Sequence, residues 1–440
     1  MSARWPVPEA VLFRGARVID PSTGHDAEAD VLVAGERVEA IGAGLDPQGA
    51  EVLECAGLVL APGLVDLHTH LREPGAEHKE TIATGTRAAA AGGFTAVSSM
   101  ANTDPVTDHA GIVAEIRDKA AEAGLADVFP VGAITKDLAG ESMAELGEMV
   151  EAGVRMFSDD GNCVPTARTL RNALVYAKAF TAEVVIADHC EDASLVAGGH
   201  MHEGVHSYSL GLAGRPAEAE EIIVARDLAI AHATAGRIHI CHVSSARSVE
   251  LIRRAKADGV RVTAEVTPHH LVFTDDDLVG YDTRFKVNPP LRTAEDRDAL
   301  RAGVADGTID AIATDHAPHA VEEKESEFDQ APPGTIGLET ALAAVLTHLV
   351  LPGVVELSRA IEAMSVTPAR ILGATGHGGA IEPGRHANLV VFDPAETWVV
   401  EPPFASKARN CAFTGSELTG RVRHTMLRGS LTVADGKVSR

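Results

Sequence analysis

The chain has 440 residues, of which 45% are hydrophobic and 4% aromatic, enough for one large domain with an accessory piece. Its 63 acidic and 38 basic residues give a net charge of −25, which argues against general affinity for nucleic acid or anionic membranes. Five scattered cysteines without a C-x-x-C pair, no signal-like N-terminus and no apolar run of about 18 residues lead us to expect a cytoplasmic protein.

The first sixty residues are predicted to form short β-strands. Runs such as VLFRGARVID and ADVLVAGERVEAIG alternate apolar and polar residues between turn-forming residues. The end of the chain, with ANLVVFD, TWVVEP and RVRHTMLRGSLTVADG, has the same pattern. We therefore expect residues 1–62 and 376–440 to form one small composite β-domain built from both termini.

Residues 63–375 alternate strand-like apolar runs with Ala-rich helical stretches. The eight candidate strands are LVDLHTH, FTAVSSM, DVFPVGAIT, VRMFSDD, EVVIADHCE, RIHICHVSS, RVTAEVTPHH and AIATDHAPH. Stretches between them, such as HKETIATGTRAAAAGG, have the 3.6-residue spacing of outer helices. This α/β pattern predicts a (β/α)8 TIM-type barrel, with a doubly wound sheet as the alternative. Polar residues end nearly every run, which favours the barrel, because its strand ends meet at one mouth.

Histidines and carboxylates stand at these strand ends. In DLHTHLREPG, His68 and His70 lie two positions apart, so on a strand both face the same side; the alternative is a buried structural pair. Other strand ends offer Asp159, Asp160, His189, His242, Asp315, His316 and His319. Such side chains are typical Zn²⁺ ligands. Their number exceeds the need of one tetrahedral ion, which predicts two metal ions with a bridging carboxylate and a bridging hydroxide.

Other candidate ligands are interpreted differently. His200 and His202 form a second H-x-H in a Gly-flanked segment, which we interpret as loop surface. His269 and His270 close the seventh strand and either line the mouth or are structural. Cys241 adjoins His242, but strand neighbours face opposite ways, so we expect a packing residue.

With these motifs assembled, the sequence resembles the dihydroorotases, specifically the bacterial class I enzymes of the amidohydrolase superfamily. The likeness covers PGLVDLHTHLREPG, GGFTAV, MANTDP, FSDDG, HCED, HVSS, EVTPHHL, KVNPPLR, IATDHAPH, GLET and ANLVVFD. The superfamily's barrel and composite β-domain match the predicted organisation. The similar dihydropyrimidinases, hydantoinases and allantoinases typically bridge their metals with a carboxylated lysine on the fourth strand, where this chain has FSDDG.

The resemblance implies two divalent metal ions, expected to be Zn²⁺, and a ligand set for them. One ion would be held by His68, His70 and Asp315, the other by His189 and His242, with Asp160 bridging them and Asp159 as the fallback.

The resemblance also implies residues that bind the substrate. Dihydroorotate carries a carboxylate, which a planar guanidinium binds through two parallel hydrogen bonds. Arg72 lies close enough to the ligands to do this; the alternative is a surface arginine before a turn. The other implied contacts are His70, Asn102, Asn288, His319, Pro333 and Gly334. A proline at 333 replaces the family's usual aromatic residue, which leaves its ring contact in doubt.

The implied reaction is reversible hydrolysis of (S)-dihydroorotate to N-carbamoyl-L-aspartate in pyrimidine synthesis, with Asp315 as general acid and base. The alternatives are another cyclic amidohydrolase, such as an allantoinase or hydantoinase, and a non-catalytic partner of aspartate transcarbamoylase. We expect a homodimer and leave association with aspartate transcarbamoylase open. The charged, Pro-rich segment 319–334 is either a lid at the mouth or a surface loop.

Overall fold

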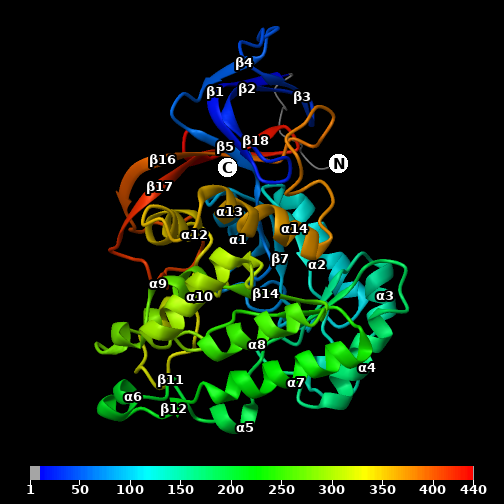
Figure 1. Cartoon of the computed structure of the whole chain (residues 1–440), viewed down its shortest axis with the longest axis vertical. Helices are drawn as coiled ribbons and strands as arrows, with labels where there is room; N and C mark the ends of the chain where they lie inside the picture. The colour runs from blue at the N-terminus through cyan, green and yellow to red at the C-terminus, as the bar shows by residue number, and fades with distance from the viewer. Residues whose placement is uncertain (1–9, 440) are drawn as a thin grey trace.

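One β-sheet contains strands from both ends of the chain. The structure, a computed structural model, describes residues 10–439 (Figure 1); residues 1–9 of the expected β-domain and residue 440 lie outside this range. The sheet has nine strands in the order β19-β18-β17-β16-β5-β1-β2-β3, with β4 beside β1. The antiparallel pairing of β5 with β16 joins the N-terminal strands to the C-terminal ones. The expectation that both termini share one sheet is confirmed.

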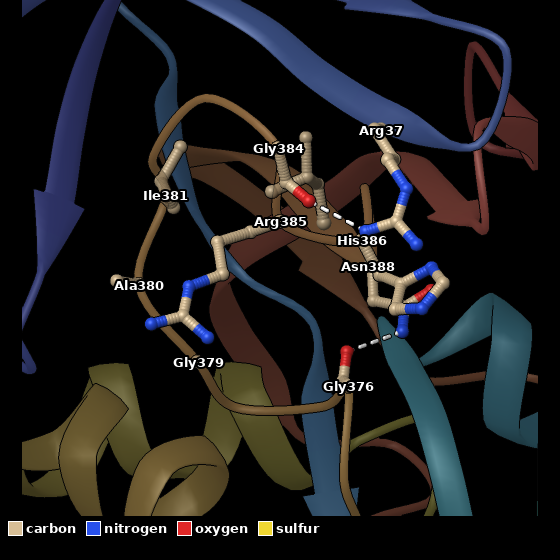
Figure 2. A pocket seen from close by; sticks show the side chains of 10 residues that line it. Arg37, Gly376, Gly379, Ala380, Ile381, Gly384, Arg385, His386 and Asn388 are labelled. Atoms are coloured by element: carbon tan, nitrogen blue, oxygen red, sulfur yellow. Dashed lines mark hydrogen bonds between the residues drawn. The ribbon is translucent and has the colours of Figure 1, made fainter.

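The strands of this sheet have the following bounds: β1 (Ala10–Asp20), β2 (His25–Ala34), β3 (Arg37–Gly42), β4 (Glu51–Glu54), β5 (Val59–Pro62), β16 (Leu389–Val399), β17 (Glu417–Leu427), β18 (Ser430–Ala434) and β19 (Lys437–Val438). The loop before β16 is held against the N-terminal strands. Arg37 Nη1 donates to the Gly384 carbonyl at 2.5 Å, and Asn388 Nδ2 donates to the Gly376 carbonyl at 2.7 Å (Figure 2).

The middle of the chain contains parallel strands at the eight predicted places. A three-stranded sheet contains β6 (Leu64–Asp66), β7 (Phe94–Ser99) and β8 (Asp127–Pro130). A five-stranded sheet contains β9 (Met156–Phe157), β10 (Val185–Asp188), β13 (Ile238–Ile240), β14 (Val262–Val266) and β15 (Ala311–Ile312). Isolated parallel bridges, Gly132 to Phe157 and Thr69 to His316, connect the two sheets at both ends. Neighbours along the chain are therefore neighbours in space.

Helices follow most of these strands and cover their outer side (Figure 1). Their bounds are α1 (Ile82–Ala91), α2 (Ala110–Ala123), α3 (Leu146–Glu151), α4 (Ala167–Ala177), α7 (Glu218–Thr234), α8 (Ala246–Ala257), α10 (Ala294–Asp306), α12 (Ala341–Val345), α13 (Leu357–Ile361) and α14 (Thr367–Leu372). Polar side chains fix several helix starts: Thr81, Ser245 and Thr293 each accept a hydrogen bond from a first-turn backbone N–H.

Shorter elements lie in the connections. They are α5 (Ala193–Val196), β11 (Met201–His202), α6 (Val205–Leu210), β12 (Gly214–Arg215), α9 (Pro268–Val272), α11 (Val321–Lys324), three 3₁₀ turns η1 (Lys136–Leu138), η2 (Asp275–Leu278) and η3 (Thr283–Phe285), and two π-helical turns η4 (Leu346–Val350) and η5 (Glu362–Val366). Within residues 10–439, no helix is long and apolar enough to cross a membrane.

The parallel strands are buried on both faces. In β10, Ile186 packs in the large cluster shared with the helices, whereas Val185 and Ala187 pack in a separate cluster with residues of the other strands. Such two-sided burial is typical of parallel strands covered by helices, and it produces continuous apolar runs. The buried strands thus form a rigid support for the polar residues that follow them.

Candidate active site

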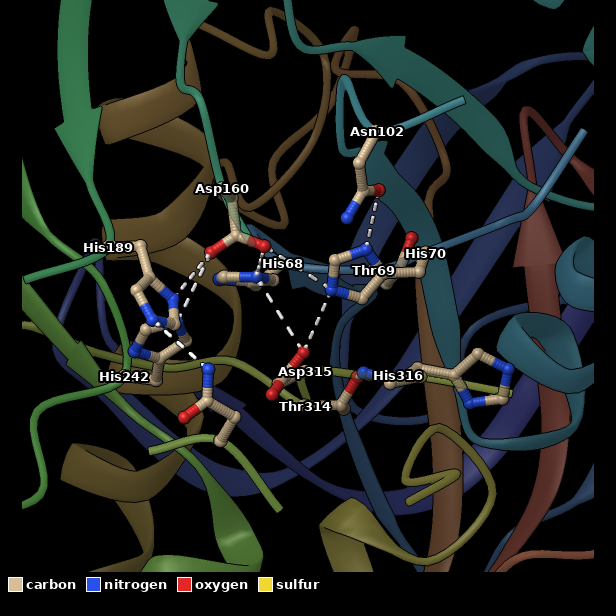
Figure 3. Close-up of polar contacts among 12 residues, drawn as sticks. His68, Thr69, His70, Asn102, Asp160, His189, His242, Thr314, Asp315 and His316 are labelled. Carbon is tan, nitrogen blue, oxygen red and sulfur yellow. Dashed lines mark hydrogen bonds and ion pairs between the residues drawn. The ribbon is translucent and has the colours of Figure 1, made fainter. Parts of the chain in front are cut away.

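The predicted metal ligands come together from five strands of the parallel sheets (Figure 3). His68 and His70 follow β6, and the others follow β9, β10, β13 and β15: Asp160, His189, His242 and Asp315. All of these side chains are buried. The strand ends therefore place a set of imidazoles and carboxylates, which we call the His/Asp centre, in one buried volume.

The Asp160 carboxylate lies between two pairs of histidines (Figure 3). Its Oδ2 atom is 3.3 Å from His68 Nε2 and 3.5 Å from His70 Nε2. Its Oδ1 atom is 3.2 Å from His242 Nε2 and 3.4 Å from His189 Nδ1. One carboxylate thus faces both halves of the centre.

Asp159 is turned away from the centre. Its Oδ1 accepts hydrogen bonds from the backbone N–H groups of Ile134 at 2.8 Å and Thr135 at 2.9 Å, and its Oδ2 accepts from Thr135 Oγ1 at 2.5 Å. His316 is also turned away, with Nε2 3.4 Å from Glu80 Oε2. Of the two neighbouring aspartates, Asp160 is the one that faces the histidines.

Asp315 completes one half of the centre. Its Oδ1 lies 3.1 Å from His70 Nε2 and 3.7 Å from His68 Nε2. Its backbone φ is 45°, in the left-handed region that aspartate tolerates better than most residues. A strained residue of this kind persists only where its surroundings hold it in place, as they do at many active sites.

In their neutral forms, His68, His70 and His189 would each point a lone pair at a carboxylate. His68 Nδ1 lies 2.7 Å from Glu265, His70 Nδ1 lies 2.9 Å from the Asn102 side-chain oxygen, and His189 Nε2 lies 3.1 Å from Glu191. These partners assign the proton to the outer nitrogen, so the inner nitrogen faces Asp160 without one. A lone pair against a buried carboxylate is repulsive, so a cation must lie between them, either a second ring proton or a metal ion.

The geometry fits divalent metal ions. Ligand atoms about 2.0–2.1 Å from a tetrahedral zinc lie roughly 3.3 Å apart, close to the separations in the centre. His68 Nε2 is buried and has no hydrogen-bond partner among the described residues. It takes part in two groups whose ligand atoms all lie within 4.8 Å of one another, one with His70 and Asp315 and one with Asp160 and His242.

The charges of the centre also favour cations. Burial lowers the pKa of His68, but the Asp160 and Glu265 carboxylates outweigh burial and hold that pKa well above its usual range. Burial raises the pKa of Asp160, yet the His68 charge and the hydrogen bonds from His189 and His242 hold it well below its usual range. The carboxylates are therefore ionised at neutral pH, and the centre attracts positive charge.

Two carboxylates that support the centre were missed in the sequence. Glu265 on β14 contacts His68 Nδ1 and also lies 3.2 Å from His239 Nε2. Glu191, two residues after His189 in the chain, contacts the His189 ring. The available signals were a carboxylate inside a buried strand and a carboxylate two residues after a predicted ligand. Cys241, expected to be a packing residue, is buried within 4.8 Å of ligand atoms of His68 and Glu265.

Three of the predicted substrate-binding elements lie on the Asp315 side of the His/Asp centre. They are Arg72, His319 and the segment 333–334. The Arg72 side chain donates from Nε to the Pro318 carbonyl at 3.2 Å. His319 Nε2 donates to the Pro333 carbonyl at 2.9 Å. Burial and the Arg72 charge lower the pKa of His319 to about 3, so this imidazole is neutral. Gly334 has φ 142°, and a Cβ there would lie 2.9 Å from His319 Nε2, so the position requires glycine.

Asn102 and Asn288 lie on opposite sides of the centre. Asn102 contacts His70, whereas Asn288 Nδ2 lies 3.3 Å from His189 Nε2 and its Oδ1 accepts from Arg215. Arg215, Asn288 and His189 line a cavity of about 360 Å³. A cavity beside the histidines offers space for a small ligand.

The segment 319–334 is anchored by a buried lysine. Lys324 Nζ donates to the carbonyls of Pro332 at 2.9 Å and Gly334 at 3.0 Å, and burial lowers its pKa to about 7. These contacts connect the segment to the glycine beside His319. A lid role for this segment stays a prediction.

The interpretation of His202 as loop surface is wrong. It lies in β11 and is buried, because β11 pairs with β12 in a small parallel ladder. Arg292 Nη1 donates to His202 Nδ1 at 3.3 Å, which assigns the ring proton to Nε2. His270 is held on both ring nitrogens, by Thr267 Oγ1 at 2.8 Å and the Pro289 carbonyl at 3.0 Å, and is structural.

Comparison with known proteins identifies the family. The model of the dihydro-orotase-like family matches residues 57–248. The dihydroorotase of Streptomyces coelicolor is 52% identical over 431 residues, which cover 97% of this chain and 99% of that protein. The dihydroorotase of Pelotomaculum thermopropionicum is 50% identical, with coverage of 97% and 99%. The chain belongs to the dihydroorotase family. As a member of the dihydroorotase family, it is a hydrolase of a cyclic amide.

Solved structures of related hydrolases share the fold of this dihydroorotase family member. An L-hydantoinase (dihydropyrimidinase) from Arthrobacter aurescens superposes with a TM-score of 0.87 at 27% identity, covering 98% of this chain and 97% of that one. A dihydropyrimidinase from Brevibacillus agri superposes with a TM-score of 0.84 at 26% identity, covering 98% and 96%. The match extends over both the parallel strands and the composite sheet.

Proposed function

We propose that this chain hydrolyses (S)-dihydroorotate reversibly to N-carbamoyl-L-aspartate, a step of pyrimidine synthesis. One arrangement with two features carries this proposal. Asp160 lies between two histidine pairs, and the Arg72 guanidinium lies close enough for its charge to interact with Asp160 and Asp315. The first feature suits a hydrolytic metal pair, and the second suits the carboxylate of the substrate. The dihydroorotase relatives support the same reaction.

We also infer the finer architecture. The eight parallel strands would close into a (β/α)8 barrel over residues 63–375, with residues 1–62 and 376–440 as the composite β-domain. Strand pairing in chain order and the two bridges between the parallel sheets support this inference. The site then lies at the carboxyl ends of the strands, where barrel enzymes have their active sites.

The centre would hold two divalent metal ions, for which we propose Zn²⁺. The proposed ligands are His68, His70 and Asp315 for one ion, His189 and His242 for the other, and Asp160 for both. Bound in this way, two such ions supply hydroxide at neutral pH and polarise a carbonyl group. Glu265, Asn102 and Glu191 would fix the ring nitrogen that each histidine presents.

Asp315 would move the proton. Burial raises its pKa, but the hydrogen bond from His70 and the His68 charge hold that pKa below its usual range, so the carboxylate is ionised and can accept a proton. It would take the proton of the attacking water and deliver it to the departing ring nitrogen. In the reverse direction the same group would take the proton back from nitrogen, as a reversible reaction requires.

Arg72 would bind the substrate carboxylate, with Asn102 and His319 beside it. We expect Arg72→Lys to raise KM for dihydroorotate roughly ten-fold with little change in kcat, because an ammonium keeps the charge but loses the two-pronged hydrogen bonding. Both residues are equally strained at the Arg72 φ of 62°, so the backbone cost is matched. Steady-state kinetics test this, with Arg247→Lys at an exposed position of α8 as control. An unchanged KM would remove Arg72 from the binding site.

A substrate panel tests the proposed function. We expect turnover of dihydroorotate and of N-carbamoyl-aspartate, and none of allantoin or hydantoin, since neither offers a carboxylate to Arg72. Preference for hydantoin would favour the activity named for the structural neighbours. Absence of turnover on every substrate, with metal bound, would favour a non-catalytic partner of aspartate transcarbamoylase. The homodimer, association with that enzyme and a cytoplasmic location stay predictions.

A further inference from the structure

Arg215 reaches the active-site cavity from the insertion after β10. The parallel pairing of Met201 with Gly214 and of His202 with Arg215 fixes β12 against β11. The Arg215 side chain is 19% exposed and lines the same cavity as Glu191 and Asn288. An arginine from outside the strand ends is thereby placed beside the His/Asp centre.

The guanidinium connects the metal side of the site to the substrate side. Arg215 Nε donates to the Gly199 carbonyl at 2.9 Å, which holds the side chain in place. Arg215 Nη1 donates to Glu191 Oε2 at 3.1 Å and also to Asn288 Oδ1. Glu191 in turn contacts His189 Nε2 at 3.1 Å. One donor group therefore contacts both the carboxylate that supports His189 and the Asn288 amide.

This contact determines which end of the Asn288 amide faces the site. A guanidinium only donates hydrogen bonds, so the amide atom that faces Arg215 must be the oxygen. The Nδ2 group of Asn288 then lies 3.3 Å from His189 Nε2. That ring nitrogen already donates to Glu191, so it cannot accept from Asn288, and the Nδ2 hydrogens stay available to a ligand.

We propose that Arg215 is a positioning residue that fixes the Asn288 side chain with its N–H donors toward the carbonyl oxygen of the substrate ring. The inference rests on the proposed function, since the ring of dihydroorotate supplies the acceptor. Without Arg215 the amide can rotate and present its oxygen instead, which would repel that carbonyl. Arg215 thus acts through Asn288 and does not touch the reacting atoms.

The test compares Arg215→Met with Arg215→Lys. Methionine has no hydrogen-bond donor, whereas the lysine ammonium, like the guanidinium, donates hydrogen bonds and accepts none. Both are measured in the full chain with its metals bound, with Arg247→Met on α8 as control. We expect Arg215→Met to raise KM for dihydroorotate roughly ten-fold with kcat within about three-fold of the parent, because binding is lost in the ground and transition states alike. Arg215→Lys should lie between Arg215→Met and the parent, and the control should match the parent.

A double-mutant cycle shows whether Arg215 acts through Asn288. Because the two residues would act as one unit, Arg215→Met should add less than about two-fold to the KM of Asn288→Ala. Independent, multiplying effects would overturn the proposal, as would an unchanged KM in Arg215→Met. A loss of bound metal in Arg215→Met, measured by plasma mass spectrometry, would overturn it in favour of a role on His189. If the unsubstituted protein does not turn over dihydroorotate, the proposed function is overturned as well. If the unsubstituted protein is active and Arg215→Met has the same KM, only this inference is overturned.

Discussion

Asp315→Asn is expected to lower dihydroorotate turnover by roughly 10³-fold, within the range that a general acid or base contributes. The amide keeps the shape of the side chain and tolerates the φ of 45°, but it cannot accept a proton from water. Circular dichroism and thermal unfolding should match the parent, because the substitution leaves the backbone conformation available. Initial rates in both reaction directions measure the loss, which should be equal in the two.

Asp315→Ala shows the effect of the left-handed backbone conformation in addition to the loss of the carboxylate. It should lose turnover to the same extent but also lose about 1 kcal/mol of stability, since alanine is disfavoured in the left-handed region. Asp258→Asn, at the exposed end of α8, is the matched control and should behave as the parent. Near-parental turnover in Asp315→Asn would remove Asp315 as the proton carrier.

Asp160→Asn is expected to release at least one of the two proposed metal ions and to lower turnover by at least about 10²-fold. An amide can offer one oxygen to one ion, but its NH₂ group cannot ligate the second. Its NH₂ group would also face two histidines. Metal content per chain, measured together with initial rates, tests this prediction.

Asp159→Asn is the control for Asp160→Asn. Asp159 is equally buried and adjacent in the chain, yet it binds the backbone of Ile134 and Thr135. Its substitution should lower thermal stability, because the amide oxygen would accept the two backbone N–H groups less strongly than the carboxylate does and the NH₂ group would replace the acceptor of the Thr135 hydroxyl. It should leave the metal content unchanged. Loss of metal from Asp159→Asn, with metal retained in Asp160→Asn, would reverse the assignment of the two aspartates.

The sequence predicts most of the centre because its ligands follow apolar strands. His68 and His70 are two positions apart after β6, and the other ligands each follow a strand of their own. Strand ends that meet at one edge make such residues neighbours whatever their separation along the chain. Local spacing and strand order therefore predict the candidate ligands, and the family resemblance selects the proposed set from among them.

The choice between Asp159 and Asp160 could not be made in the same way. Both follow β9, and their directions depend on the short segment after it, where Thr135 binds Asp159. The contact of Glu265 with His68 joins residues 197 positions apart, which no local pattern encodes. His202 was misplaced because its burial comes from pairing with a strand in the same insertion.

Metal content per chain, determined by plasma mass spectrometry on the sample whose dihydroorotate turnover is measured, tests the central claim most directly. The geometry around Asp160 predicts two divalent ions per chain in the fully active protein, and activity that falls as either is removed by a chelator. Full activity with one ion per chain, or with none, would contradict a bridging role for Asp160.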